Sequence, residues 1–222
     1  MRTIFQIIFF ITSSLVFAQS GSISYETISK KYKKSENQEI NEYLKQTENS
    51  DFTIILDFNK ICSHSYENIK ITESNIGEKL LKILLDYKPS YYFSNEKTLY
   101  LDSEEVLIKK TINQVWNIAT ESKKIDNYLC YKATCVEKYI ARDGNPKERT
   151  ITAWFCPELP YSFGPLGYNG LPGLILELEK NENKVVAKSI VLSDEKTTIE
   201  LPNKKIISEE EYNKKIKENF GY

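Results

Sequence analysis

Short stretches rich in β-branched and aromatic residues follow one another along most of this 222-residue chain. Some alternate apolar and polar side chains, as in the first stretch, and this two-residue period is typical of a strand with one buried face. Turn residues separate the stretches. The sequence therefore predicts strands at Ser22–Lys30, Asp51–Asn59, Lys60–Asn68, Tyr91–Asn95, Thr98–Leu101, Glu104–Lys110, Gln114–Ala119, Tyr128–Ala141, Glu148–Cys156, Leu174–Glu179 and Val185–Leu192.

Helical periodicity is limited to a few segments. Four leucines at helical spacing predict a helix over Gly77–Leu85, and a charged helix is predicted over Glu209–Glu218. The charged stretch Lys33–Ser50 fits a loop or a short helix equally well. Many short strands with one or two short helices predict a mainly β fold with a single antiparallel sheet. The pattern alone leaves open whether that sheet is flat, curved or closed.

The first 18 residues have the three-part layout of a signal peptide. Arg2 precedes the apolar run Ile4–Ile11, and Val16-Phe17-Ala18 supplies small residues at a cleavage site before Gln19. A membrane anchor is the alternative, but the apolar run is shorter than the roughly 20 residues needed to span a bilayer. We therefore expect residues 1–18 to be removed. Residues 19–222 would form one exported β-rich domain without a membrane span, in the periplasm rather than outside the cell.

The charges of the chain are balanced. The formal net charge is −1, and Lys and Glu are interspersed along the sequence. Proteins that bind nucleic acid usually carry a basic patch, which this chain lacks. The sequence therefore indicates no nucleic-acid partner.

Four cysteines, in a chain predicted to enter an oxidising compartment, predict two disulfides. The stretch from Asp143 to Pro146 has the composition of a hairpin turn. Folding the chain about Asn145 or Pro146 places Cys135 opposite Cys156, at a separation that suits a disulfide. This favours Cys135–Cys156 and, by elimination, Cys62–Cys130. The alternative is that some of these cysteines are free buried thiols.

The segment Pro157–Gly173 has an unusual composition, because it contains four of the seven prolines and four of the eight glycines. Proline fixes φ and removes an N–H donor, whereas glycine permits positive φ or a close approach of two backbones. The strand pattern of Leu174–Glu179 follows directly. The composition predicts a connection between strands that holds one shape.

Within this segment Gly170–Ile175 spells the motif that names the GLPGLI family of exported bacterial proteins, and the chain resembles that family. Tyr128–Thr134 is similar to the family block Gly-Tyr-x-Cys-x-Lys-Ala-Thr, although Asn127 stands where glycine is usual. Ala153–Phe155, with the prolines and the Gly164-Pro165 pair that follow, is similar to the segment before the motif. Many residues from Trp116 to Glu179 match the family pattern, and few residues before Trp116 do.

The resemblance implies a secreted, β-rich protein without an established activity. The family itself resembles the curved half-barrels of periplasmic lipoprotein carriers, so we expect a curved, half-barrel-like sheet. Cys135 and Cys156 stand where the family pattern usually carries threonine-like residues, which suggests a disulfide added to this member. The candidate binding loop consists of Gly164, Pro165, Tyr168, Gly170, Leu171, Pro172 and Gly173.

The residues offer little for catalysis. His64 is the only histidine, so a metal site with several imidazoles is excluded. Cys62 and His64 share a strand face but make a poor thiolate–imidazole pair. The acidic pairs Asp57 with Glu67, and Glu177 with Glu179, could be written as glycosidase carboxylates. The alternation of Glu177 and Glu179 with leucines is, however, typical of the solvated face of a strand. We assign no catalytic residue, metal or cofactor.

The sequence favours a non-enzymatic envelope protein that binds or carries an apolar ligand, a peptide or a membrane-protein partner. This prediction depends on a loop that holds one shape, next to a sheet rich in aromatic residues. One alternative is a structural subunit of an envelope assembly, in which the loop docks on another subunit. The other is a hydrolase of unrecognised type, which would need polar side chains that converge in a cleft.

Overall fold

A computed structural model describes residues 18–29, 36–48, 52–68, 76–140, 145–181 and 183–220. The predicted signal peptide, apart from Ala18, and much of the predicted turn before Pro146 lie outside these residues. The described chain forms twelve strands: β1 (Ser20–Ile28), β2 (Thr53–Asn59), β3 (Cys62–Glu67), β4 (Ser90–Phe93), β5 (Thr98–Asp102), β6 (Val106–Thr111), β7 (Asn117–Ile125), β8 (Tyr128–Ile140), β9 (Pro146–Cys156), β10 (Leu174–Lys180), β11 (Asn183–Ser193) and β12 (Lys205–Ser208).

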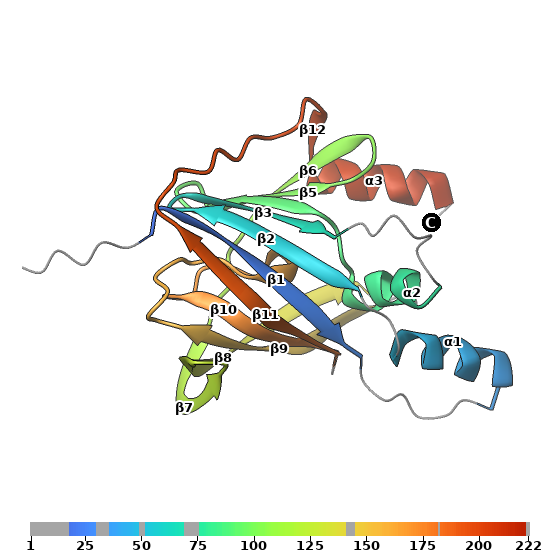
Figure 1. Ribbon diagram of the computed structural model, residues 1–222. Coiled ribbons are helices and arrows are strands. Elements are labelled where there is room, and N and C mark those ends of the chain that lie inside the picture. Colours follow the sequence, from blue (N-terminus) through green and yellow to red (C-terminus); the bar gives the residue numbers. More distant parts are fainter. Residues whose placement is uncertain are drawn as a thin grey trace, which may run out of the picture.

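All twelve strands belong to one curved sheet (Figure 1). Its spatial order is β12-β6-β5-β4-β3-β2-β1-β11-β10-β9-β8-β7. Neighbours are antiparallel except β12 and β6, which are parallel. Within the described residues the end strands β12 and β7 do not pair, so the sheet is mixed and open. The prediction of a mainly β, curved sheet is confirmed. The short parallel strand β12 was missed by the sequence prediction.

The described residues also form three α-helices outside the sheet: α1 (Gln38–Glu48), α2 (Ile76–Leu85) and α3 (Glu209–Phe220). In Figure 1, α1 and α2 lie together at one end of the sheet, and α3 follows β12 directly. Leu81 and Leu85 of α2 are fully buried, as the leucine spacing predicted. None of the helices in the described part of the chain is long and apolar enough to cross a membrane.

The strand alternation builds the core. Ile54, Leu56 and Phe58 of β2 are each at most 1% exposed, and the residues between them are only half-buried. Across the strand boundary, Ile23 and Tyr25 of β1 lie opposite Leu56 and Ile54 and are fully buried as well. Because alternate residues of a strand point to opposite faces, these side chains line the inner, concave face of the sheet.

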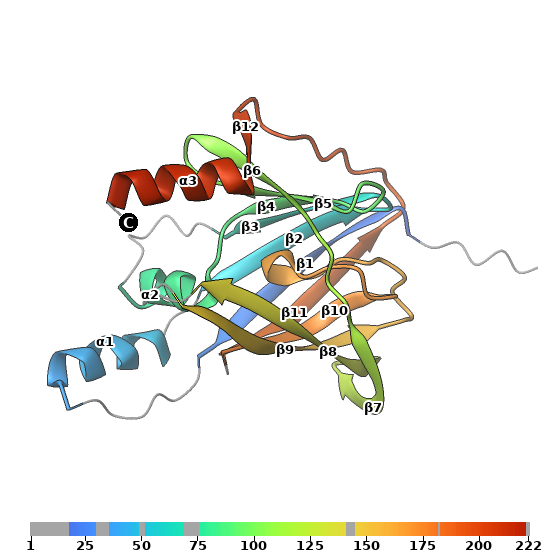
Figure 2. The ribbon, with the colours of Figure 1, turned by 180° about the vertical axis from the view of Figure 1, so that it is seen from behind.

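The loop between β9 and β10 fills that concave face, and Figure 2 shows it inside the curve of the sheet. Its aromatic side chains cross to the opposite half of the fold. The ring of Phe58 on β2 lies 4.7 Å from that of Tyr161, and the ring of Tyr92 on β4 lies 6.1 Å from that of Phe163. Tyr25 adds a polar link, since its hydroxyl donates to the carbonyl of Ile175 at 2.7 Å. The loop is therefore part of the hydrophobic core.

The register of the β8–β9 hairpin differs from the sequence prediction. Cys135 lies opposite Ile151, not opposite Cys156. Pro146, which was predicted to lie in the turn, already belongs to β9 and pairs with Ile140. The chain therefore turns before Pro146, and every opposed pair of the hairpin shifts accordingly.

This shift changes which cysteines can meet. All four are buried free thiols, so neither predicted pair, Cys135–Cys156 or Cys62–Cys130, is formed. Cys62 instead donates its thiol hydrogen to Asn59 at 3.3 Å. Cys130 donates its thiol hydrogen to the carbonyl of Tyr128 at 3.7 Å.

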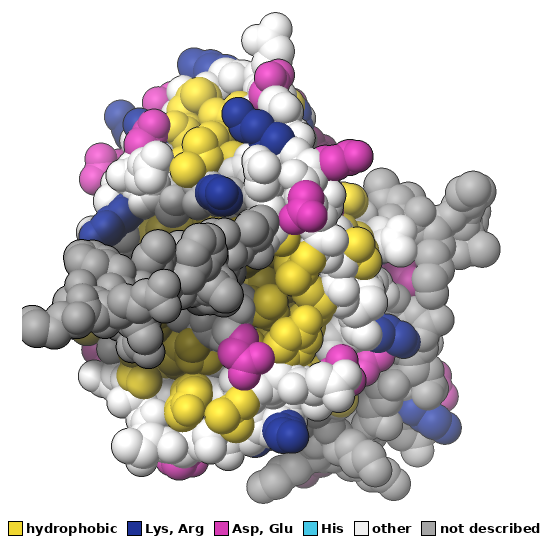
Figure 3. All heavy atoms as spheres, turned by 60° about the vertical axis from the view of Figure 1, so that its left-hand side comes forward, with side chains coloured by type: hydrophobic (Ala, Val, Ile, Leu, Met, Phe, Trp, Pro, Cys, Tyr) yellow, Lys and Arg dark blue, Asp and Glu magenta, His cyan; other side chains and the backbone are white. Residues whose placement is uncertain are grey.

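Figure 3 turns the left-hand side of Figure 1 toward the viewer. Hydrophobic side chains gather over the middle of this face, and charged side chains lie around them. Near the end of β11, Val191 and Leu192 are exposed apolar side chains, at 62% and 41%.

Candidate binding groove

The C-terminal half of strand β8 is paired on one side only. β9 pairs with β8 from Tyr131 to Ile140. On the other side β7 pairs with β8 only as far as Thr134, opposite Asn117. Beyond Thr134, no backbone group of residues 135–140 bonds to any described residue other than those of β9. This part of β8 is a free strand edge, with unpaired N–H and C=O groups at alternate residues.

The free edge exists because the segment 112–116, between β6 and β7, leaves the sheet. Gln114 and Trp116 point to the β9–β10 loop instead of pairing with β8. The side-chain oxygen of Gln114 accepts the N–H of Asn169 at 3.0 Å, and the indole N–H of Trp116 donates to the Asn169 carbonyl at 2.9 Å. Asn169 in turn accepts the Gly164 N–H with its side chain at 3.2 Å. One buried asparagine therefore fixes both segments.

A groove of about 480 Å³ lies between this segment and the free edge. Its walls are residues 110–115, Asn117 and residues 135–138, and the buried Tyr168 also lines it. Val115 and Val136 contribute the most exposed apolar surface, with 78% and 57% of their areas accessible. At one end Lys110 donates to Glu209 at the start of α3, at 2.9 Å. The groove combines open backbone groups with apolar side chains.

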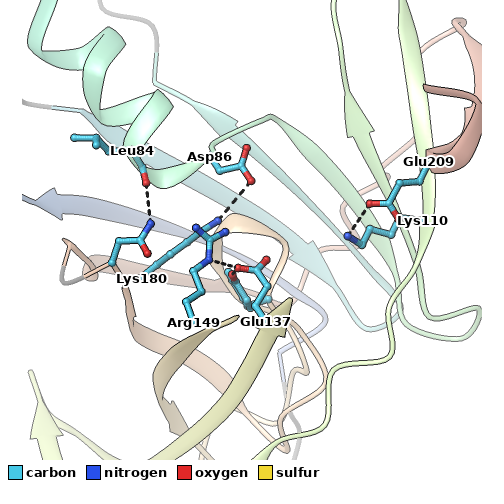
Figure 4. Close-up of polar contacts among 9 residues, drawn as sticks. Leu84, Asp86, Lys110, Glu137, Arg149, Lys180 and Glu209 are labelled. Carbon is cyan, nitrogen blue, oxygen red and sulfur yellow. Dashed lines mark hydrogen bonds and ion pairs between the residues drawn. The ribbon is translucent and has the colours of Figure 1, made fainter. Parts of the chain in front are cut away.

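Glu137 lines this groove and is held by a buried polar network (Figure 4). Its carboxylate accepts hydrogen bonds from Arg149 of β9 at 2.5 Å and from the Tyr168 hydroxyl at 2.9 Å. Burial alone would raise the pKa of Glu137, but Lys180 and the hydrogen bonds from Arg149 and Tyr168 together lower it. The carboxylate is thus ionised and its charge is compensated from inside the fold.

Lys180 of β10 is the second charge of the network and is only 3% exposed. Its ammonium lies 5.7 Å from the centre of the Tyr168 ring and 3.9 Å from the carboxylate of Asp86. Burial lowers the pKa of Lys180, while Glu137 acts in the opposite direction. Burial also raises the pKa of the Tyr168 hydroxyl, and Glu137 adds to that effect. The hydroxyl therefore stays protonated and can donate to the carboxylate.

The candidate binding loop from the sequence is mostly internal. Tyr168 and Leu171 are at most 2% exposed, and of the seven candidate residues only Gly170 and Pro172 are exposed. The backbone makes specific use of two glycines. Gly170 has a φ of +91°, and a Cβ on Gly173 would lie 2.1 Å from the Cys156 carbonyl oxygen. Of the seven, Tyr168 alone lines the groove. Binding by the loop as a whole stays a prediction.

The residues considered for catalysis do not converge. The ring of His64 stacks on that of Tyr91 at 4.1 Å, and burial lowers the pKa of His64. The thiol of Cys62 bonds to Asn59, and burial raises its pKa. The proposed thiolate–imidazole pair is therefore not assembled.

The carboxylates are likewise engaged elsewhere. Asp57 accepts a hydrogen bond from Tyr66 at 2.9 Å. Glu177 is only 7% exposed and pairs with Lys123 at 2.6 Å, so its assignment to a solvated face was wrong. The ammonium of Lys123 also lies 4.3 Å from the centre of the Trp154 ring, which places this ion pair against an aromatic side chain. Among the described residues, no three Asp, Glu, His or Cys side chains gather where they could hold a metal ion.

These observations define a class of protein: an open, curved β-sheet whose connecting loop fills its interior and whose free strand edge lines a groove. The model of a family described as a protein of unknown function (Porph_ging) matches residues 141–177, which cover β9, the loop and the start of β10. This match is compatible with the GLPGLI resemblance but does not confirm that family name. No curated protein matches the chain.

Solved structures support the fold. PNGF-II in the P21 space group aligns with a TM-score of 0.54 and 16% identity, over 89% of this chain and 33% of that chain. PNGF-II in the C2 space group gives 0.50 and 18% identity, over 90% and 32%. This chain therefore spans about a third of the PNGF-II chains. LprF from Mycobacterium bovis is a weaker match, with a TM-score of 0.29 and 10% identity over 84% and 89%.

Sequence reasoning missed the residues that shape the groove. Val115 and Val136 belong to ordinary strand patterns, and nothing in their composition marks an edge. Gln114 gave a partial signal, since a polar amide beside Trp116 is suited to bonding a neighbouring loop.

Proposed function

We propose that this protein is an exported, non-enzymatic binding protein that takes up an extended peptide segment along the free edge of β8. The observation that carries the proposal is the run of unpaired backbone at residues 135–140, beside a groove of about 480 Å³. A peptide that adds a strand to an exposed edge gains main-chain hydrogen bonds, and pockets beside the edge select alternate side chains.

The dimensions of the edge suit such a ligand. A strand rises about 3.3 Å per residue, so residues 135–140 could pair with a segment of about six residues. Val136 and Val115 offer apolar surface to alternate side chains of that segment. The network around Glu137 and Arg149 holds the strand from behind, which limits the entropy that binding would cost.

The same groove also offers a site to an apolar small ligand, because the concave face is occupied by the β9–β10 loop. Leu159, Tyr161, Phe163 and Leu171 fill that space and are each at most 5% exposed. The groove therefore gives the two ligand classes one common site, and one experiment can separate them.

The test is a selection of peptides from a random display library on the purified protein, followed by fluorescence anisotropy with the selected peptides. We expect alternating sequences whose affinity falls at least about tenfold in Val136→Glu. The matched control is Val191→Glu on β11, which is 62% exposed and lies outside the groove lining. Its affinity should equal that of the wild type.

N-methylated peptides test the hydrogen-bonding mode itself. Methylation at alternate positions that face β8 removes donors and should abolish binding, whereas methylation at the intervening positions should be tolerated. Equal tolerance at all positions, or no enriched peptide, would contradict strand addition. If no peptide is selected, but a fluorescent fatty-acid probe binds the wild type and not Val136→Glu, the groove would be assigned to an apolar ligand instead.

A further inference from the structure

Cys130 of β8 and Cys156 of β9 are the two cysteines that the register of the β8–β9 hairpin places opposite each other. The printed pairing of these antiparallel strands begins at Tyr131 with Phe155, and one further step in the same register places Cys130 opposite Cys156. Both side chains are fully buried, and the Cys130 thiol donates to the carbonyl of Tyr128 at 3.7 Å. Directly opposed residues of an antiparallel pair lie about 4.5–5.5 Å apart at Cα, within the range that a disulfide bridges.

We propose that Cys130 and Cys156 form a disulfide when the protein folds in the presence of a disulfide oxidant, and that it fixes the entry to the β9–β10 loop. This site is independent of the peptide groove. It also differs from both pairs that the sequence predicted.

The environment favours Cys156 as the attacking sulfur. Its thiolate would accept hydrogen bonds from the Cys130 thiol and from the backbone of Glu158 and Leu159, and these lower the pKa of Cys156. The pKa of Cys130 is raised instead, by its interaction with Cys156 and by burial. The thiolate is the reactive form in disulfide exchange.

The reaction balances with a small disulfide as oxidant. The Cys156 thiolate attacks one sulfur of the oxidant and releases its other half as a thiolate. The Cys130 sulfur then attacks the mixed disulfide at Cys156 and releases the second half. Two cysteine thiols are oxidised by two electrons, and the oxidant leaves as two thiols that carry the two protons. Because both cysteines are fully buried after folding, exchange takes place while the β8–β9 hairpin is forming.

The position of the bond connects it to the loop. Cys156 is the last residue of β9, and its carbonyl accepts the N–H of Leu159 at 3.2 Å. The same carbonyl lies against Gly173 at the other end of the loop. A bond from β8 to Cys156 thus anchors both ends of the segment. Cys62 and Cys135 have no cysteine opposite them and stay reduced.

The test is peptide mapping of the full chain after refolding with oxidised and reduced glutathione, with alkylation of free thiols under denaturing conditions. The expected result is a Cys130–Cys156 cross-linked peptide, a mass about 2 Da below that of the reduced chain, and alkylation of Cys62 and Cys135 only. Four alkylated cysteines, or a cross-link that includes Cys62 or Cys135, would overturn the proposal.

Thermal unfolding supplies a second readout. Reduction should lower the Tm of the oxidised protein by about 5–10 °C. Cys135→Ser, the matched control, should keep this response, and Cys130→Ser should lose it. A Cys130→Ser protein that still responds to reductant would contradict the assignment, and the mapping of the unmodified chain stands even if that variant does not fold.

Discussion

The loop between β9 and β10 and the free edge of β8 are opposites: the loop has an irregular backbone but is buried, whereas the edge has a regular backbone but is exposed. The loop is irregular, yet most of it is buried and its ends meet through Cys156 and Gly173. The edge is a regular strand, yet Val136 and Lys138 are exposed, and the backbone of residues 135–140 bonds to no described residue outside β9. An unusual composition therefore marks a packing element in this protein, while the surface suited to binding has an ordinary sequence.

The largest expected effect tests the packing role of the loop. Gly173→Ala places a Cβ 2.1 Å from the Cys156 carbonyl oxygen and 2.6 Å from its carbon, and this backbone cannot move without opening the sheet. We expect a loss of about 3–5 kcal/mol in the free energy of unfolding, measured by urea denaturation. A fully folded Gly173→Ala protein of wild-type stability would show that the loop is loosely packed.

Gly170→Ala is the control within the same loop. No atom lies within 4 Å of the added Cβ, so only the positive φ of 91° opposes the substitution. A left-handed conformation costs a non-glycine residue about 1–2 kcal/mol. The difference between the losses in unfolding free energy of the two variants therefore measures the cost of the close backbone approach at Gly173, apart from conformational strain.

An intermediate effect is expected where the loop and the edge are linked. Glu137→Gln leaves the partly buried Arg149 and the buried Lys180 without this carboxylate, and we expect a loss of about 2 kcal/mol at pH 7. Because the pKa of Glu137 is lowered in the folded protein, its contribution is present above the unfolded pKa of about 4.3 and is lost as the pH falls through the folded value. The gap between wild type and variant should therefore close below about pH 4.

Urea denaturation at several pH values measures this gap. Glu179→Gln is the control, since the Glu179 side chain is 39% exposed and its carboxylate lies as far as 4.0 Å from the ammonium of Lys184. Its effect should stay below about 0.5 kcal/mol at every pH. A Glu137→Gln difference that does not change with pH would show that the carboxylate charge is not what the network requires.

The sequence was informative where local pattern decides structure. All eleven predicted strand segments overlap observed strands, because the two-residue period of β1 and β2 follows directly from one buried face. The period could not set the register of β8 against β9, since a turn moved by a few residues changes every opposed pair. It also misjudged Glu177, because the burial of that side chain depends on Lys123 from a strand that is distant in sequence.

The candidate groove was harder to predict for a related reason. The strand predicted at Gln114–Ala119 begins only at Asn117, since Gln114 and Trp116 bond to Asn169 and draw their backbone away from β8. The free edge is therefore a consequence of two side-chain contacts across more than 50 residues of chain. Composition can indicate that a loop holds one shape. It cannot indicate that the loop holds a distant segment, here residues 112–116, away from the sheet.

The smallest expected effect on stability concerns the edge itself. Val136→Glu changes a side chain that is 57% exposed, so the free energy of unfolding should change by less than about 1 kcal/mol, as it should for Val191→Glu. Urea denaturation of both variants checks this, beside the affinity for a selected peptide, which only Val136→Glu should weaken. If Val136→Glu destabilised the protein as much as Gly173→Ala, residues 135–140 would belong to the core. If the edge contributes little to stability, its backbone groups can give up bound water and pair with an added strand. An edge that belongs to the core could not do this.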